Sequence, residues 1–212
     1  MTGDFRLLLA LSLFGLLCPE ASSLAHEQER NHSLLVELCD TTELDASILQ
    51  AARDEASGIF AKAAAHVQWE KNCELPPPAT PQSARIFIVP RIPEVIVNAY
   101  HRKHGTRNIM GFALPNLGEN RAGVIYVARQ SVEAVANKSG RISLTESHVA
   151  RAMGRVFAHE LAHRFIGPGH TEIGILKNFL DQRALISKHN DGLFFSPDQV
   201  RVLHLRIEGR SP

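Results

Sequence analysis

The chain has 212 residues, of which 44% are apolar and 21% are charged, a composition that fits one ordinary globular domain and excludes a fibrous or wholly disordered protein. Lysine and arginine together number 23 against 22 acidic residues, so the net charge of +1 provides no broad basic face for a nucleic-acid backbone. We therefore expect no nucleic-acid partner.

The first 25 residues have the three-part layout of a secretory signal. Arg6 precedes an apolar run at residues 7–17, and small residues follow between Ala21 and Ala25. A membrane-spanning helix needs roughly 20 apolar residues, which is about twice the length of this run. We predict a signal peptide at residues 1–25, a secreted or periplasmic location, and no integral membrane segment after its removal. A buried N-terminal helix is the alternative.

Two predicted strands flank a long helical pattern at the start of the mature chain. Residues 33–38 form a short apolar run that ends at Cys39, and residues 67–69 resume as a strand. From residue 42 to about 66, apolar side chains recur at three- and four-residue steps. A helical crossover makes the strands parallel, so Cys39 and Cys73 both follow strand ends at one edge of the sheet. We expect a disulfide between them; two unrelated thiols are the alternative.

Three more strands are predicted in the middle of the chain. Residues 84–89 form the clearest strand, which Pro90 ends. Residues 110–114 resemble a short strand and residues 123–128 another. The stretch between residues 92 and 107 indicates no single element.

A second long helix is predicted at residues 145–166. Ser143 and Glu146 have the spacing of a capping box, and the glycines and proline at residues 167–169 cannot continue a helix. His148 is interpreted as a surface residue near the helix start, with a place in the cleft as the alternative. The remaining predicted elements are a short helix around residues 176–186 and a last amphipathic helix that opens at Ser196 and Pro197.

The second long helix carries the sequence His159-Glu160-Leu161-Ala162-His163. Residues four apart project from nearly the same helix face, so both imidazoles can bind one ion. Glu160 lies beside them, where a carboxylate does not ligate zinc but acts as general base on a zinc-activated water. His170 follows the helix break and is the predicted third ligand, with Asp181 as the alternative. The alternative is that these histidines are solvated surface residues that bind no metal.

His159-Glu160-x-x-His163, followed by Gly167 and His170, resembles the elongated zinc motif of the metzincin clan of metallopeptidases, with one more residue before the third histidine. The order of predicted strands and helices resembles the upper subdomain of that clan. More closely, the chain is similar to a group of uncharacterised exported bacterial proteins. The resemblance implies an α+β, zincin-like fold with a mixed, mostly parallel sheet of about five strands, two long helices and a small helical C-terminal part. The single domain, residues 26–212, would divide into an upper part to about residue 167 and a lower part at 168–212.

The resemblance also implies what surrounds the metal. Leu176 stands where the clan has a methionine beneath the zinc, and would supply only an apolar floor. No tyrosine follows the third histidine, so Tyr126, His189 and Lys177 are the candidate donors to the oxyanion. The strand at residues 111–114 would lie at the edge of the cleft, either as a site for an extended peptide or as a plain edge strand.

The sequence thus predicts an exported, monomeric zinc metallopeptidase that hydrolyses peptide bonds, with Zn²⁺ as cofactor and a peptide or protein as substrate. Two alternatives stay open. A structural zinc site would make the protein non-catalytic, and a zinc amidase acting on a cell-wall amide would use the same chemistry on another bond.

Overall fold

The computed structural model describes residues 33–71, 73–74, 80–98, 109–114, 123–138, 140, 143–189 and 192–210. The predicted signal peptide at residues 1–25 lies outside these ranges. Within them, no helix combines the length and the apolar character that crossing a membrane would require.

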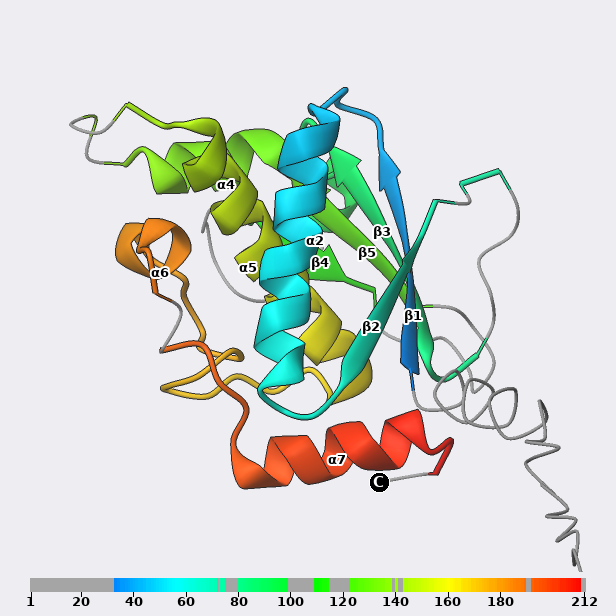
Figure 1. Cartoon of the computed structure of the whole chain (residues 1–212). Coiled ribbons are helices and arrows are strands. Elements are labelled where there is room, and N and C mark those ends of the chain that lie inside the picture. Colours follow the sequence, from blue (N-terminus) through cyan, green and yellow to red (C-terminus); the bar gives the residue numbers. More distant parts are fainter. Residues whose placement is uncertain are drawn as a thin grey trace, which may run out of the picture. The chain divides into compact units, whose positions relative to one another are not determined.

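One layer of the fold is a five-stranded sheet (Figure 1). Its strands are β1 (Ser33–Asp40), β2 (His66–Glu70), β3 (Ser83–Val89), β4 (Gly111–Ala113) and β5 (Gly123–Ala128). They are arranged in the order β2-β1-β3-β5-β4. All neighbours pair in parallel except β4, which runs antiparallel to β5 at the edge. The predicted mixed, mostly parallel sheet of an α+β fold is confirmed.

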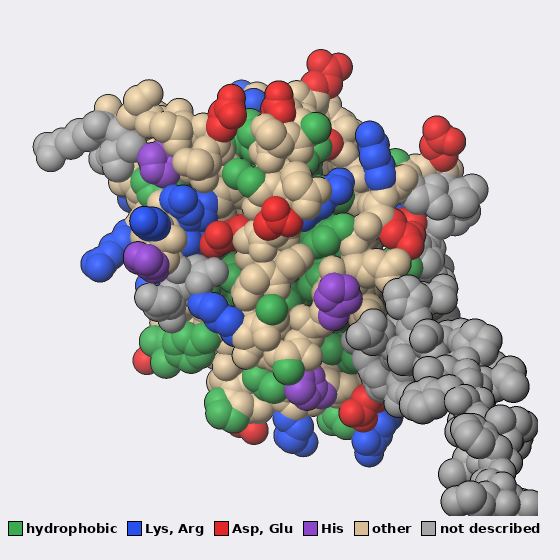
Figure 2. Space-filling model, viewed as in Figure 1, with side chains coloured by type: hydrophobic (Ala, Val, Ile, Leu, Met, Phe, Trp, Pro, Cys, Tyr) green, Lys and Arg blue, Asp and Glu red, His purple; other side chains and the backbone are tan. Residues whose placement is uncertain are grey.

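The apolar core takes every second residue of the central strands, as the alternating pattern of a sheet face requires. Two long helices, α2 (Ala46–Ala61) and α5 (Glu146–Phe165), pack against each other and cover one face of the sheet (Figure 1). The fully buried core side chains of the sheet and of α2 include Leu34, Val36, Ile86, Ile88, Ile125, Val127, Ile59 and Phe60. Acidic and basic side chains are interspersed on the face that α2 presents in Figure 2, so this face carries no uniform charge.

The first helix is shorter than the prediction of residues 42–66. Asp45 is its N-cap and accepts a hydrogen bond from the backbone of Ser47, so helical structure begins only at Ala46. Before it, the carboxylate of Asp40 accepts hydrogen bonds from the backbone of Thr42 and Leu44, which favours a turn over a helix.

The predicted helix at residues 145–166 is present as α5, but its predicted cap is wrong. Thr145, not Ser143, is the N-cap, and its side chain accepts from the backbone N–H of His148. The His148 ring closes the box in place of a glutamate, because its Nδ1 accepts from the backbone N–H of Thr145 at 3.3 Å. His148 is therefore half-buried in the cap at the helix start.

The shorter helices include α4 (Arg129–Ala136), α6 (Gln182–Ile186) and α7 (Pro197–Ile207), and residues 94–98, for which the sequence indicated no single element, are also helical. The sequence did not predict α4, which follows β5 directly. The predicted helix at residues 176–186 is wrong in its first half, because Asp181 caps α6 and residues 171–177 form a turn. The helix α7 is confirmed with Ser196 as its cap.

A disulfide joins Cys39, at the end of β1, to Cys73, just after β2. The two Cα atoms lie 5.6 Å apart and the cysteines are 34 positions apart in sequence. The predicted pairing is confirmed. It ties together the two parallel strands that α2 connects.

Candidate metal centre

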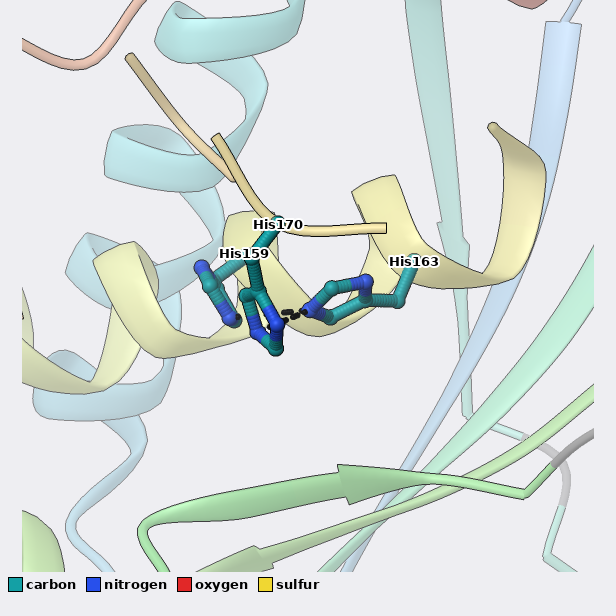
Figure 3. A group of neighbouring side chains, drawn as sticks. All are labelled: His159, His163 and His170. Atoms are coloured by element: carbon teal, nitrogen blue, oxygen red, sulfur yellow. Dashed lines mark hydrogen bonds between the residues drawn. The ribbon is translucent and has the colours of Figure 1, made fainter. Parts of the chain in front are cut away.

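Three imidazole rings meet beside the last turns of α5 (Figure 3). His159 and His163 stand one turn apart on the helix, and His170 returns to them after the chain leaves it. Gly167 allows this return because its φ of +139° is a conformation that other residues rarely adopt. The ligand nitrogens of the three rings all lie within 4.8 Å of one another. Nε2 of His163 is 3.1 Å from Nε2 of His159 and 3.1 Å from Nε2 of His170.

Backbone carbonyls fix which nitrogen of each helical histidine faces this centre. Nδ1 of His159 lies 2.7 Å from the carbonyl oxygen of Ile175, and Nδ1 of His163 lies 3.1 Å from that of Gly167. A carbonyl oxygen only accepts, so each Nδ1 must carry the proton and donate it. The Nε2 atoms therefore present lone pairs to the centre, as metal-ligating histidines do.

The two rings on α5 are held in the uncharged form that a metal requires. Burial, and then the neighbouring His163, lower the pKa of His159 to about 3. Burial also lowers the pKa of His163. Both rings are therefore neutral near pH 7, and the lone pairs of two neutral rings face each other across 3.1 Å.

The donor set fits zinc. Nitrogens bound to one tetrahedral zinc at 2.0–2.1 Å would be about 3.3 Å apart, close to the 3.1 Å between neighbouring Nε2 atoms. Imidazole nitrogens are among the ligands that zinc prefers. A divalent cation at this place would also remove the repulsion between the facing lone pairs.

Glu160 projects from α5 toward the edge strand β4 and is buried. Burial raises the pKa of its carboxyl group to about 8, and a hydrogen bond from the backbone N–H of Ala113 partly offsets this by favouring the ionised form. The side chain packs so closely on Gly111 that a Cβ atom there would lie 2.5 Å from Glu160 Cγ and Oε1. A titratable carboxylate thus follows His159 directly on α5 and is held against β4.

The turn after His170 supplies the support for His159. Thr171 donates its backbone N–H to the carbonyl of Leu176 at 2.8 Å and also forms an isolated bridge with Lys177. This turn presents the Ile175 carbonyl to the His159 ring. Leu176 follows Ile175 directly and is buried, in the part of the chain where an apolar floor is predicted.

The other residues that the sequence singled out do not belong to the group of three histidines. Asp181 is the N-cap of α6, with its carboxylate accepting from Ala184 N at 2.8 Å, and it does not belong to the histidine group. Tyr126 lies on β5 and stacks on Phe87, with ring centroids 5.7 Å apart. Lys177 lies in the turn after His170, and His189 is exposed beyond α6.

Sequence reasoning missed the backbone partners of the site. The carbonyls of Ile175 and Gly167 act through the main chain, which is the same in every residue type, and Gly111 acts through the side chain that it lacks. Gly167 alone had a signal, as the glycine in the break after the zinc motif. For Ile175 and Gly111 the sequence holds no signal, because their contacts depend on tertiary structure.

The sequence matches no family profile and no curated protein. Among solved structures, it is similar to the crystal structure of a zinc-dependent peptidase from Methanocorpusculum labreanum. The two chains share 14% sequence identity, the superposition covers 79% of this chain and 99% of that one, and the TM-score is 0.49. The chemistry of the present chain is therefore inferred from its own residues.

Proposed function

We propose that this chain is an exported, monomeric zinc metallopeptidase of the metzincin type, with His159, His163 and His170 as metal ligands and Glu160 as general base. The single observation that carries the proposal is the convergence of three imidazole nitrogens, two of them from the helix that also carries the buried Glu160. The proposed domain comprises residues 26–212, with its lower part beginning at residue 168.

The ligand set favours catalysis over a structural role. Structural zinc sites have four protein ligands, whereas catalytic sites have three and leave a position for substrate and water. The group found among the described residues contains three, and His170 is exposed to solvent. When bound, Zn²⁺ would polarise the scissile carbonyl and acidify the attacking water.

Glu160 performs the proton transfers in this proposal. Its carboxylate takes a proton from the attacking water and delivers it to the leaving nitrogen of the peptide. The hydrogen bond from Ala113 N–H and the close contact with Gly111 hold the carboxylate in one place, which efficient transfer requires. An extended peptide would pair with the neighbouring edge strand β4, the antiparallel border of the sheet.

Export forms part of the proposal. The disulfide between Cys39 and Cys73 supports an oxidising compartment, because such bonds rarely persist in a reducing cytosol. The predicted signal peptide at residues 1–25 would direct the chain there.

Zinc content and hydrolysis, measured on residues 26–212, test the proposal. We expect one zinc per chain and cleavage of a denatured-protein mixture that a chelator stops. Glu160→Gln should keep the zinc and lose hydrolysis, His170→Ala should lose the zinc, and the matched control Asp181→Asn should keep both.

Four outcomes would contradict parts of this proposal. Full hydrolysis by Glu160→Gln would refute the mechanism. Zinc loss in Asp181→Asn but not in His170→Ala would replace the third ligand. Tightly held zinc without cleavage of any peptide would favour a structural site, and release of cell-wall amides alone would make the protein an amidase.

A further inference from the structure

The edge strand β4 turns alternate peptide groups toward different sides. Leu114 N donates to Val124 O and Ala128 N donates to Met110 O, each at 2.8 Å, so the even-numbered residues of this segment pair with β5. In an antiparallel ladder the intervening residues direct their N–H and C=O groups the other way. Gly111 and Ala113 therefore present their peptide groups at the free edge of the sheet.

The Glu160 side chain reaches this free edge at residues 111 and 113. Its carboxylate accepts the outward N–H of Ala113, and its side chain lies where a Cβ atom of residue 111 would be. That Cβ would lie 2.5 Å from Glu160 Cγ and Oε1 and 2.7 Å from Cδ, well inside van der Waals contact. A side chain at residue 111 would therefore compete with the Glu160 side chain for the same space.

Space, and not backbone freedom, explains the glycine at this position. The described glycines with positive φ are Gly140, Gly167, Gly174 and Gly209, and Gly111 is not among them. Any residue could adopt the backbone conformation of Gly111, so what a side chain would disturb there is Glu160. The atoms that it would meet form the end of a flexible side chain, which can rotate away while the strand stays in place.

We infer that Gly111 is a positioning residue for the proposed reaction: its missing side chain lets Glu160, which follows the proposed ligand His159 on α5, sit against the free edge of β4. This inference rests on the proposed function. A side chain at residue 111 displaces the carboxylate from Ala113 and from its position next to the metal centre, without removing a metal ligand or a core contact.

Gly111→Ala tests this role, with Gly58→Ala on α2 as the matched control because no atom lies within 4 Å of a Cβ there. We expect Gly111→Ala to lower kcat by about 100-fold, the scale of a misplaced catalytic group, with KM and zinc content unchanged. In the Glu160→Ala background, which lacks both the Cγ atom and the carboxylate, Gly111→Ala should cause almost no further loss of the residual rate. An equal fractional loss in both backgrounds would overturn the inference.

The backbone amide of Ala113 gives a readout that needs no activity. In ¹H–¹⁵N spectra of the zinc-loaded chain, Gly111→Ala should shift this resonance in the direction that Glu160→Ala shifts it, and Gly58→Ala should leave it in place. An unmoved Ala113 resonance in Gly111→Ala would overturn the inference. If the unsubstituted chain proves inactive, the proposed function fails, while this resonance still decides whether residue 111 sets the position of Glu160.

Discussion

Arg155 holds α5, α2 and the segment around α6 together from a fully buried position. Its Nε donates to Glu55 on α2 at 2.8 Å, and its terminal nitrogens donate to the carbonyls of Ala184 and Ser187 at 2.7 and 2.9 Å. The arginine side chain is 1% exposed and that of Glu55 is 20% exposed. Replacing Arg155 by methionine would keep most of the stem volume and remove every one of these donors.

The expected loss follows from what the substitution leaves behind. Removing one partner of a buried ion pair costs about 3–5 kcal/mol, and the partial exposure of Glu55 places this pair at the lower end. The two orphaned carbonyls add about 1 kcal/mol each, since water reaches the end of a short helix more easily than a core. We therefore expect a loss of about 4–5 kcal/mol, or a melting temperature lower by about 10–15 °C for a chain of this length.

Urea denaturation of Arg155→Met measures this loss, and Arg151→Met is the matched control. Arg151 lies one turn earlier on α5 and donates one hydrogen bond, to Ile186 O at 2.7 Å, from a half-exposed position. Its replacement should cost about 1 kcal/mol. Adding Glu55→Gln to Arg155→Met should recover part of the loss by removing the charge that Arg155 compensated. Equal midpoints for Arg155→Met and Arg151→Met would refute the reasoning, because the buried network would then contribute nothing beyond a surface contact.

Three further predictions concern the disulfide and the pH dependence of the metal-free chain. Replacing Cys39 and Cys73 by serine should lower the free energy of unfolding by about 4 kcal/mol in urea titrations, because the bond closes a loop of 34 positions; an unchanged midpoint would contradict this. The folded chain binds an extra proton at Glu160 between pH 4.5 and about 8, so thermal stability in chelator should fall as the pH rises through this window, and Glu160→Gln should remove that part of the slope. The unfolded chain binds an extra proton at His159 between pH 6.5 and about 3, so stability should also fall as the pH drops through this range; a His159→Gln variant with the same acid slope would refute this assignment.

The elements with a strong periodic pattern could be predicted from the sequence. Every predicted strand is present, and α5 and α7 begin within a residue or two of the predicted positions, because burial on one face imposes a two- or four-residue period on the chain. The helix α4 was missed because it begins directly at the end of β5 without a capping side chain. The cap of α5 was misassigned because a histidine at its third position replaces the usual glutamate.

The shared orientation of His159 and His163 could be predicted for a similar reason, since two residues four apart on a helix share a face in any fold. The role of Asp181 could not be predicted from the sequence. Its carboxylate caps α6 and does not join the histidines, and its closeness to the motif in sequence does not reveal this. The contacts of Glu160 with Gly111 and Ala113 were also out of reach. They join residues about 50 positions apart, through a strand whose pairing edge only the tertiary structure defines.

The electrostatics of the site explain why these residues belong together. Two neutral imidazoles direct lone pairs at each other, and the adjacent carboxyl group is buried with a pKa raised to about 8. The facing lone pairs and the buried carboxyl group are each unfavourable when no charge lies nearby. Apolar side chains at the same positions on α5 would avoid both costs. One divalent cation would relieve both at once, because it accepts the lone pairs and favours the ionised carboxylate. A site that is strained in this specific way is therefore best understood as one built around a positive charge.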